Sequence, residues 1–318
     1  MEQKALQMGA AVLMLALLLR LLGNSGAGKE ELGKTMIFLS SGRLVTETVP
    51  AQTEAPVENV EVAEEAAAVP VFGEKDLSYV QVNGEWAVDT AALLRQPLEW
   101  ELKAEEPTVL ILHSHGTESY TADGTYQETS PYRTLDTEHN MVSIGQRVAE
   151  LLEAGEVRVI HDCTLHDYPA YNDAYGNARA SMERYLQEYP SICLVLDLHR
   201  DAAQGADGTQ KAEAVTLNGR SSGQLMLVMG SDKGSLPYPN WEKNLSLAVK
   251  LQAQLEQTYP GLCKPIKLVS YRYNQDLSSG ALLVEVGTAG NTHAQALAAA
   301  EFLAEGILAL AKGANISG

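Results

Sequence analysis

Short apolar runs alternate with amphipathic segments from Pro107 to the end of the chain, and this pattern constrains the fold most. The runs at 109–112, 157–160, 192–196, 214–217, 225–228, 266–269 and 281–286 have the length and composition of buried strands. Between them, residues 137–154, 174–188, 241–258 and 292–311 have helical character. Strands that alternate with helices predict an α/β fold, a mostly parallel twisted sheet with helices on both faces.

The first 106 of the 318 residues predict a different organisation. Residues 5–22 are almost entirely apolar and nearly long enough to span a bilayer, so residues 1–23 are predicted to form a transmembrane signal anchor. A cleaved signal peptide is the alternative, but the sequence after the apolar run is a poor cleavage site. Residues 24–76 are acidic and contain interspersed prolines, which predicts a disordered, extended stalk. Residues 77–106 are predicted to form a small pre-domain with a hairpin turn at Asn83-Gly84.

The charge of the chain excludes one broad class of function. Lys and Arg number 23 against 41 Asp and Glu, which gives a net charge of −18. Binding to phosphate backbones needs clustered cations, so no nucleic-acid partner is expected.

Residues able to carry chemistry follow three of the predicted strands. His113, His115 and Glu118 follow 109–112, His199 follows 192–196, and Glu285 lies near the end of 281–286. Function gathers at the carboxyl ends of the strands in an open parallel sheet, so these side chains are expected to meet. Two histidines and a glutamate are typical ligands of a catalytic Zn²⁺, which keeps one position open for water. A further glutamate, Glu285, then serves as general base.

The zinc ligands have competitors within the same part of the sequence. His115 and Glu118 are spaced as H-x-x-E, and a turn would bring both to one side. Glu138 and His139, expected in the first turn of the helix at 137–154, are alternatives to Glu118 as the middle ligand. His113 is expected to point away from His115 and to act as a core or supporting group.

Several stretches of the chain resemble the stage II sporulation protein P family, which is similar to zinc-dependent N-acetylmuramoyl-L-alanine amidases. The resemblance covers residues 107–311 and includes the anchor and stalk. The matching stretches are Val109-Leu-Ile-Leu-His-Ser-His-Gly-Thr-Glu-Ser-Tyr120, Val159-Ile-His-Asp162, Leu165-His-Asp-Tyr168, Leu196-Asp-Leu-His-Arg-Asp201, Tyr273-Asn-Gln-Asp276 and Leu283-Val-Glu-Val-Gly287.

The resemblance implies an amidase-like zinc catalytic domain at residues 107–313. His115, Glu118 and His199 would hold Zn²⁺, and Glu285 would be catalytic. The remaining implied groups, on the substrate side or behind the ligands, are His113, Arg200, Tyr273, Asn274 and Gln275.

The family also implies a biological setting. Its substrate is peptidoglycan, in which it cleaves the amide between muramic acid and L-Ala, and also peptide cross-links. The resemblance also implies that the protein acts together with stage II sporulation proteins D and M during engulfment. It further implies a protein that crosses the membrane once and carries its catalytic domain on the extracytoplasmic side. Two other interpretations stay open: a zinc carboxypeptidase acting on wall peptides, and a non-catalytic wall-binding scaffold.

Overall fold

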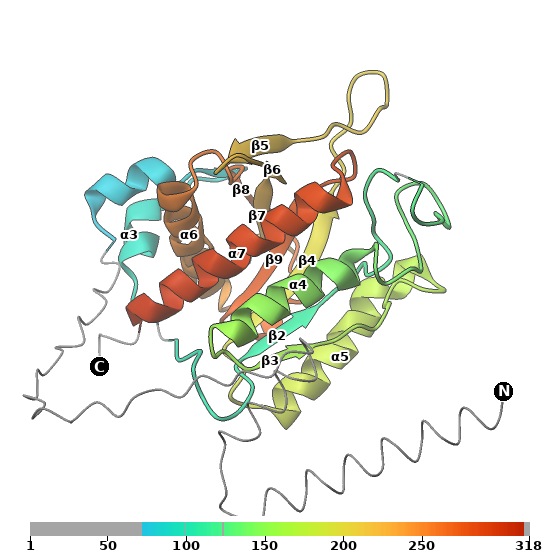
Figure 1. The fold of residues 1–318 in the computed structure, drawn as a ribbon. Coiled ribbons are helices and arrows are strands. Elements are labelled where there is room, and N and C mark those ends of the chain that lie inside the picture. The colour runs from blue at the N-terminus through green and yellow to red at the C-terminus, as the bar shows by residue number, and fades with distance from the viewer. Residues whose placement is uncertain (1–71, 99, 123, 315–318) are drawn as a thin grey trace, which may run out of the picture. The chain divides into compact units, whose positions relative to one another are not determined.

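A seven-stranded sheet runs through the described part of the chain (Figure 1). The structure is a computed structural model that describes residues 72–98, 100–122 and 124–314. The helices are α3 (Thr90–Arg95), α4 (Met141–Ala154), α5 (Ala174–Glu188), α6 (Trp241–Thr258) and α7 (His293–Ala314), with 3-10 helices η1 (Glu74–Tyr79), η2 (Tyr171–Asp173) and η3 (Gln275–Leu277). The strands are β1 (Val82–Gly84), β2 (Val109–Leu112), β3 (Val159–His161), β4 (Leu194–Asp201), β5 (Ala214–Leu217), β6 (Arg220–Gly223), β7 (Leu225–Met229), β8 (Ile266–Leu268) and β9 (Ala281–Thr288).

The sheet is mostly parallel, as predicted. Its strand order is β1-β8-β7-β9-β4-β2-β3, and β5 and β6 form a separate hairpin. Neighbouring strands are parallel except β7 and β9, which pair antiparallel from Leu225 opposite Val286 to Val228 opposite Leu283. The sheet therefore has two parallel parts that run in opposite directions and meet between β7 and β9.

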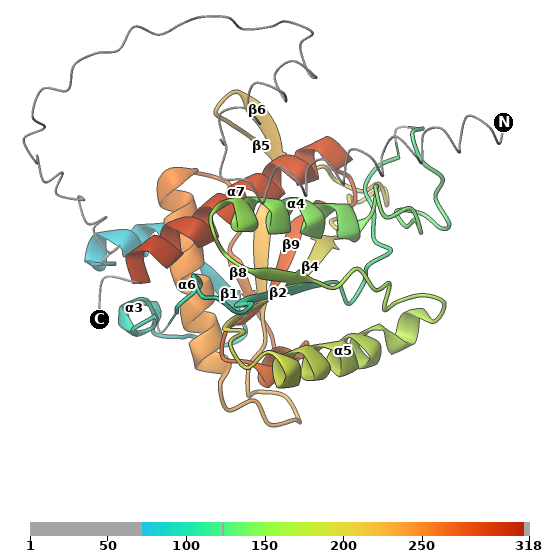
Figure 2. The same cartoon turned by 60° about the horizontal axis from the view of Figure 1, so that its bottom comes forward.

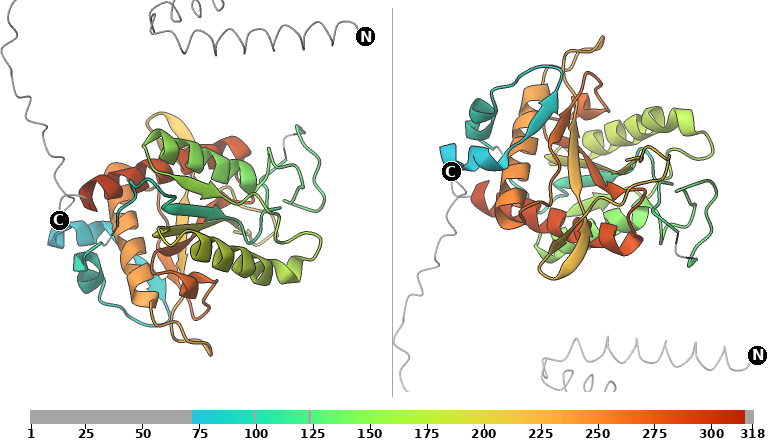
Figure 3. Two further views of the ribbon diagram at one scale, coloured as in Figure 1. Left: turned by 90° about the horizontal axis from the view of Figure 1, so that it is seen from below. Right: turned by 90° about the horizontal axis from the view of Figure 1, so that it is seen from above.

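Helices cover both faces of the sheet, which confirms the predicted layers (Figures 2 and 3). Along β2, Val109 and Ile111 join the core cluster under α4, α6 and α7, whereas Leu110 and Leu112 join the cluster under α5. Burial on both faces explains why this strand is apolar throughout instead of alternating with polar residues.

Among the described residues, no helix takes the place of α5 over β7 and β9. There, the loop from Val269 to Gly280, which contains η3, lies on the sheet. Val269 and Tyr273 from this loop pack against Met226, Val228 and Leu283. The loop therefore covers β7 and β9 on the same face of the sheet as α5, where β7 and β9 pair antiparallel.

The segment before residue 107 contributes to the same sheet. The predicted hairpin at Asn83-Gly84 is wrong, because β1 pairs in parallel with β8, Val82 opposite Ile266. Helix α3 packs on α6. The predicted anchor (1–23) and the predicted stalk up to residue 71 lie outside the described residues, and the last stalk residues belong to η1.

Helix α4 begins later than the sequence pattern indicated. Its N-cap is Asn140, whose side chain accepts a hydrogen bond from the amide of Val142 (2.9 Å). The prediction that Glu138 and His139 lie in its first turn is therefore wrong, since both precede the cap. A helix can begin wherever an Asn side chain accepts a hydrogen bond from a free amide of the first turn. The spacing of apolar residues does not reveal such a cap.

Lys250 is a buried cation that joins α6 to α3. Its side chain is 3% exposed, and its ammonium donates to the Leu93 carbonyl (2.8 Å) and to Ser246 Oγ (2.7 Å). The Ser246 hydroxyl donates to the same carbonyl (2.8 Å), which lies in the last turn of α3. Burial lowers the pKa of Lys250 to about 8.

We predict that Lys250 gives the protein a pH-dependent stability in mild alkali. Its folded pKa of about 8 lies below the value of about 10.4 in an unfolded chain, so between these values the unfolded chain binds more protons. The free energy of unfolding should therefore rise from pH 8 to 10, by about 1–2 kcal/mol relative to Lys250→Met. Urea titrations at both pH values measure this difference. The exposed Lys243 on the same helix is the control, and Lys243→Met should parallel the unchanged protein. Parallel curves for Lys250→Met would contradict the prediction.

Candidate active site

The candidate residues on β4 and β9 are direct neighbours in the sheet. These strands pair in parallel, and the register places His199 opposite Glu285. Leu196 and Leu198 face the core under α4 and α7, so Asp197 and His199 face the α5 side. Strand β4 extends to Asp201, beyond the predicted end at residue 196. His199 and Glu285 are thus held by strand backbone.

The loop after β2 brings His115 and Glu118 to the same place. The amide of Glu118 donates to the carbonyl of His115 (3.1 Å), which closes a turn across the H-x-x-E segment. The ring centroids of His115 and His199 are 5.5 Å apart. Glu118 Oε2 lies 3.6 Å from His199 Nδ1. Residues far apart in the sequence therefore gather at the common edge of β2, β4 and β9.

The Glu118 carboxylate is surrounded by positive charge. Its Oε1 lies 3.4 Å from both Arg133 Nη2 and Arg200 Nη1, and its Oε2 accepts from the Arg200 amide (3.3 Å). Burial alone would raise the pKa of Glu118, but Arg200 and His199 outweigh burial and lower it to about 2. Glu118 is therefore an anion at neutral pH.

An aspartate lies behind each of the two histidines. His199 Nε2 lies 2.9 Å from Asp197 Oδ1, without the alignment of a hydrogen bond, and His115 Nδ1 lies 3.7 Å from Asp167 Oδ2. Burial would lower the pKa of His199, but Asp197 and Glu118 hold it well above its ordinary value. Carboxylates behind imidazoles are the arrangement that orients histidine ligands in metal sites.

Glu285 has the character of a proton carrier. Burial is the main cause that raises its pKa to about 8, and the nearby Glu118 and Asp201 act in the same direction against His199. Its Oε2 is buried without a hydrogen-bond partner. A carboxyl group whose pKa is raised into this range, placed beside histidines, can gain and lose a proton at moderate pH, as acid–base catalysis requires.

His113, Glu138 and His139 do not join this cluster. The ring of His113 lies between the Leu198 carbonyl (3.2 Å) and His161 Nε2 (3.0 Å), on the α4 side of β2. Burial lowers its pKa to about 3, so it is neutral. Glu138 is exposed, and His139 Nδ1 lies 2.8 Å from Asp136 Oδ2.

The other residues implied by the resemblance lie around the cluster and bond or pack against the loops beside it. Arg200 donates to the carbonyls of Ser119 (3.1 Å) and Tyr132 (3.2 Å). In the loop over β7 and β9, Asn274 donates to the Tyr175 carbonyl (2.8 Å). Gln275 is buried and bridges the Gly230 amide (2.9 Å) and the Val228 carbonyl (2.8 Å). The ring of Tyr273 is tilted against that of Tyr175 at 5.5 Å.

Sequence reasoning missed the residues that support this cluster. Arg133 bonds Asp167 (2.7 Å), approaches Glu118, and lies over the ring of Tyr171, 4.5 Å from its centroid. Tyr171 in turn stacks on His115 at 4.5 Å. Tyr175 lies parallel to His199 at 6.2 Å. Asp167 falls within a family-like stretch of the sequence, but no spacing rule assigns any of these residues a role.

The donor set fits a zinc ion held by His115, Glu118 and His199. No group of three or more His, Cys, Asp or Glu side chains within the described ranges is already in metal-binding geometry. The Glu118–His199 separation of 3.6 Å is nevertheless close to the spacing of about 3.3 Å between two ligand atoms on a tetrahedral zinc. In addition, Glu285 Oε2 beside these residues is buried without a hydrogen bond, whereas His115 Nδ1 and His199 Nε2 face Asp167 and Asp197. A buried oxygen without a partner beside this donor set indicates that a further group completes the site.

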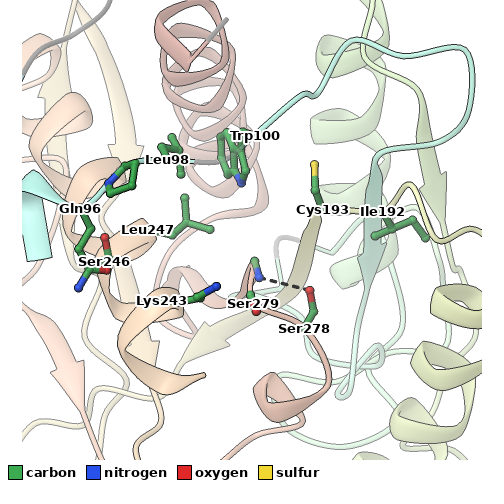
Figure 4. A pocket seen from close by; sticks show the side chains of 12 residues that line it. Gln96, Leu98, Trp100, Ile192, Cys193, Lys243, Ser246, Leu247, Ser278 and Ser279 are labelled. Carbon is green, nitrogen blue, oxygen red and sulfur yellow. Dashed lines mark hydrogen bonds between the residues drawn. The ribbon is translucent and has the colours of Figure 1, made fainter. Parts of the chain in front are cut away.

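A cavity of about 410 Å³ elsewhere in the molecule is unconnected with this cluster (Figure 4). It is lined by residues that include Trp100, Cys193, Ser246 and Gly280. Cys193 and Gly280 precede β4 and β9, whereas His199 and Glu285 lie near the ends of these strands. The cavity therefore opens at the opposite edge of the sheet.

We predict that Arg133 is important for stability because it neutralises buried carboxylates. Arg133→Met leaves the fully buried Asp167 with only Thr117 and His115 as partners. The free energy of unfolding should fall by about 2–3 kcal/mol. Arg147, whose guanidinium pairs with Glu301 on the surface, is the matched control, and Arg147→Met should cost less than about 1 kcal/mol. Urea denaturation in EDTA measures both changes. Equal effects would contradict the proposed role of Arg133.

The family model and the curated relative that match this chain are both stage II sporulation protein P. The family model described as stage II sporulation protein P (SpoIIP) matches residues 28–308. The stage II sporulation protein P of Bacillus subtilis (strain 168) is 26% identical over 198 residues, which are 59% of this chain and 47% of that protein. The chain thus matches about half the length of that relative.

Solved structures with a related arrangement are N-acetylmuramoyl-L-alanine amidases. The enzyme from Clostridium difficile 630 aligns with 68% of this chain and 100% of its own, at 13% identity and a TM-score of 0.37. The apo enzyme from Mycobacterium abscessus aligns with 65% of this chain and 96% of its own, at 15% identity and a TM-score of 0.37. TM-scores of this size transfer neither a site nor an activity. The family model, in contrast, spans most of the sequence, and the chain belongs to the stage II sporulation protein P family.

Proposed function

We propose that this protein is a membrane-anchored, zinc-dependent peptidoglycan hydrolase that cleaves the amide bond between N-acetylmuramic acid and L-Ala. The observation that carries the proposal is the meeting of His115, Glu118 and His199 beside Glu285, which lies opposite His199 in the sheet. Membership of the stage II sporulation protein P family supports a role of this hydrolase in sporulation.

Each residue of the cluster has a distinct role in this proposal. His115, Glu118 and His199 would hold Zn²⁺, and Asp167 and Asp197 would orient the two imidazoles. When bound, the metal would polarise the scissile carbonyl and acidify a water molecule. Glu285 would accept a proton from the attacking water and deliver it to the leaving amine. Arg133 and Arg200 would keep Glu118 anionic and fixed in place.

The setting of this reaction is also part of the proposal. The apolar residues 5–22 would anchor the chain in the cell membrane, with the catalytic part on the extracytoplasmic side, between the membranes during engulfment. Cleavage of peptide cross-links, and joint action with stage II sporulation proteins D and M, follow from the family resemblance.

We predict that Glu118, rather than Glu138, is needed to bind zinc. Glu118→Gln keeps the shape of the side chain but removes the anionic ligand, so the purified protein should lose most of its bound zinc and its metal affinity should fall at least about tenfold. Glu138→Gln changes an exposed side chain and should retain about one zinc per chain. Metal analysis by mass spectrometry and competition with a chelator measure both variants. The reverse pattern would assign the middle ligand to Glu138.

We predict that Glu285→Gln retains zinc but loses hydrolysis. An amide cannot accept a proton, so kcat on purified cell wall should fall by about 10²–10⁴-fold. EDTA should abolish activity in the unchanged protein, and added Zn²⁺ should restore it. Product analysis identifies the bond: an amidase leaves muramic acid free of peptide, whereas a carboxypeptidase releases single C-terminal residues. Full hydrolysis by Glu285→Gln, or activity after complete removal of metal, would contradict the mechanism.

A further inference from the structure

A row of aromatic rings leads from the candidate active site to the surface. Tyr175 lies parallel to His199 with centroids 6.2 Å apart, Tyr273 follows at 5.5 Å, and Tyr271 at 6.0 Å from Tyr273. Tyr175 and Tyr273 are partly buried, but Tyr271 is 69% exposed. We call these three tyrosines the tyrosine row. An exposed ring that continues a row beginning at His199 is in position to contact a ligand bound there.

The loop that carries Tyr271 and Tyr273 is held rigidly. Tyr273 and Asn274 are consecutive non-glycine residues with positive φ, 49° and 59°, a conformation that costs free energy and persists only where contacts impose it. The contacts are those of Asn274 with the Tyr175 carbonyl and of Gln275 with the Gly230 amide. The row is therefore preformed, which reduces the entropy lost on binding.

Close packing fixes the backbone of this loop as well. A Cβ atom built on Gly230 would lie 2.2 Å from the Tyr271 carbonyl oxygen, so only glycine allows the loop to approach this closely. The side chain of Tyr271, in contrast, is left in solvent. The backbone of Tyr271 is thus held against Gly230 while its ring stays accessible to a ligand.

The charges around the tyrosine row favour a neutral ligand. Arg179 and Arg272 lie beside it, and both already pair with Asp276, at 3.1 and 3.0 Å. The chain as a whole carries a net charge of −18. An acidic peptide or another anion would therefore find neutralised cations and a repulsive field. A ring face carries partial negative charge and suits the weakly positive C–H face of a pyranose, and the phenol hydroxyls can bond sugar hydroxyls.

We propose that the tyrosine row is a saccharide subsite that receives the glycan part of the substrate through stacking on Tyr271. This inference rests on the proposed function, because it places the sugar next to the amide that the candidate active site would cleave. It also assigns the substrate a direction: the glycan lies along the loop over β7 and β9, and the peptide extends elsewhere from His199 and Glu285.

Binding of a glycan that lacks peptide tests the subsite without any hydrolysis. The probe is the β-1,4-linked tetramer of N-acetylglucosamine, titrated by calorimetry into the Glu285→Gln protein. Tyr271→Ala and Tyr271→Leu in this background should weaken binding by at least about tenfold, since both remove the ring. Tyr271→Phe retains the ring and should bind within about twofold of the parent. Because Tyr271 is exposed, all three variants should keep the thermal unfolding midpoint of the parent.

Several outcomes would overturn the subsite. These are no tetramer binding by the parent, equal binding by Tyr271→Ala, or loss of binding in Tyr271→Phe as large as in Tyr271→Ala. An acidic stem tripeptide without sugar is titrated in parallel, and its binding should not respond to Tyr271→Ala. If Tyr271→Ala weakened the binding of the tripeptide but not of the tetramer, the tyrosine row would bind peptide instead of glycan. A separate assay tests the proposed function itself: if the unchanged protein does not hydrolyse cell wall, the proposed function is wrong, whatever the glycan binds.

Discussion

The structure depends on charged side chains that are buried on one face of a parallel sheet. Asp197 and His199 come from β4 and Glu285 from β9, and the strand register gives them little freedom to separate. Ionised groups removed from water are costly unless they are paired, so Asp197 pairs with His199, whereas the carboxyl of Glu285, which lacks such a partner, has a raised pKa. Glu118 and Arg200 complete the charge balance. A cluster of this kind persists because the backbone hydrogen bonds of the sheet hold it together.

The second requirement is that the loops of two connections, β2 to α4 and β3 to α5, return to the cluster. Glu118 lies in the connection from β2 to α4, as does Arg133, whereas Asp167 lies between β3 and α5. Arg133 contacts both carboxylates, and Thr117 donates to Asp167 (2.6 Å). These contacts join two connections that no backbone ladder holds. Side-chain contacts, instead of strand backbone, therefore hold His115 and Glu118 in the cluster.

The sequence predicted the layers and most elements, because buried strands and amphipathic helices leave clear patterns. It placed β2, β5, α5 and α6 at their observed bounds. It also brought His115, His199 and Glu285 to one edge, since parallel strands share their carboxyl ends. It failed where a local contact decides the outcome. Asn140 caps α4 and excludes Glu138 from the helix, and the pairing of β1 with β8 replaces a hairpin. The roles of Arg133, Asp167 and Tyr175 depend on which loops meet in the folded protein. The periodicity of apolar residues in the sequence does not predict these loop contacts.

The reversal of strand direction between β7 and β9 places different covering elements on the two sides of Glu285. Strand β9 has a parallel neighbour, β4, on one side, and an antiparallel neighbour, β7, on the other. Here α5 covers β2 and β4, and the loop that carries Tyr273 covers β7 and β9. Asn274 joins the two coverings at the Tyr175 carbonyl. The strand reversal thus gives Glu285 both a buried carboxyl environment and an aromatic wall beside it.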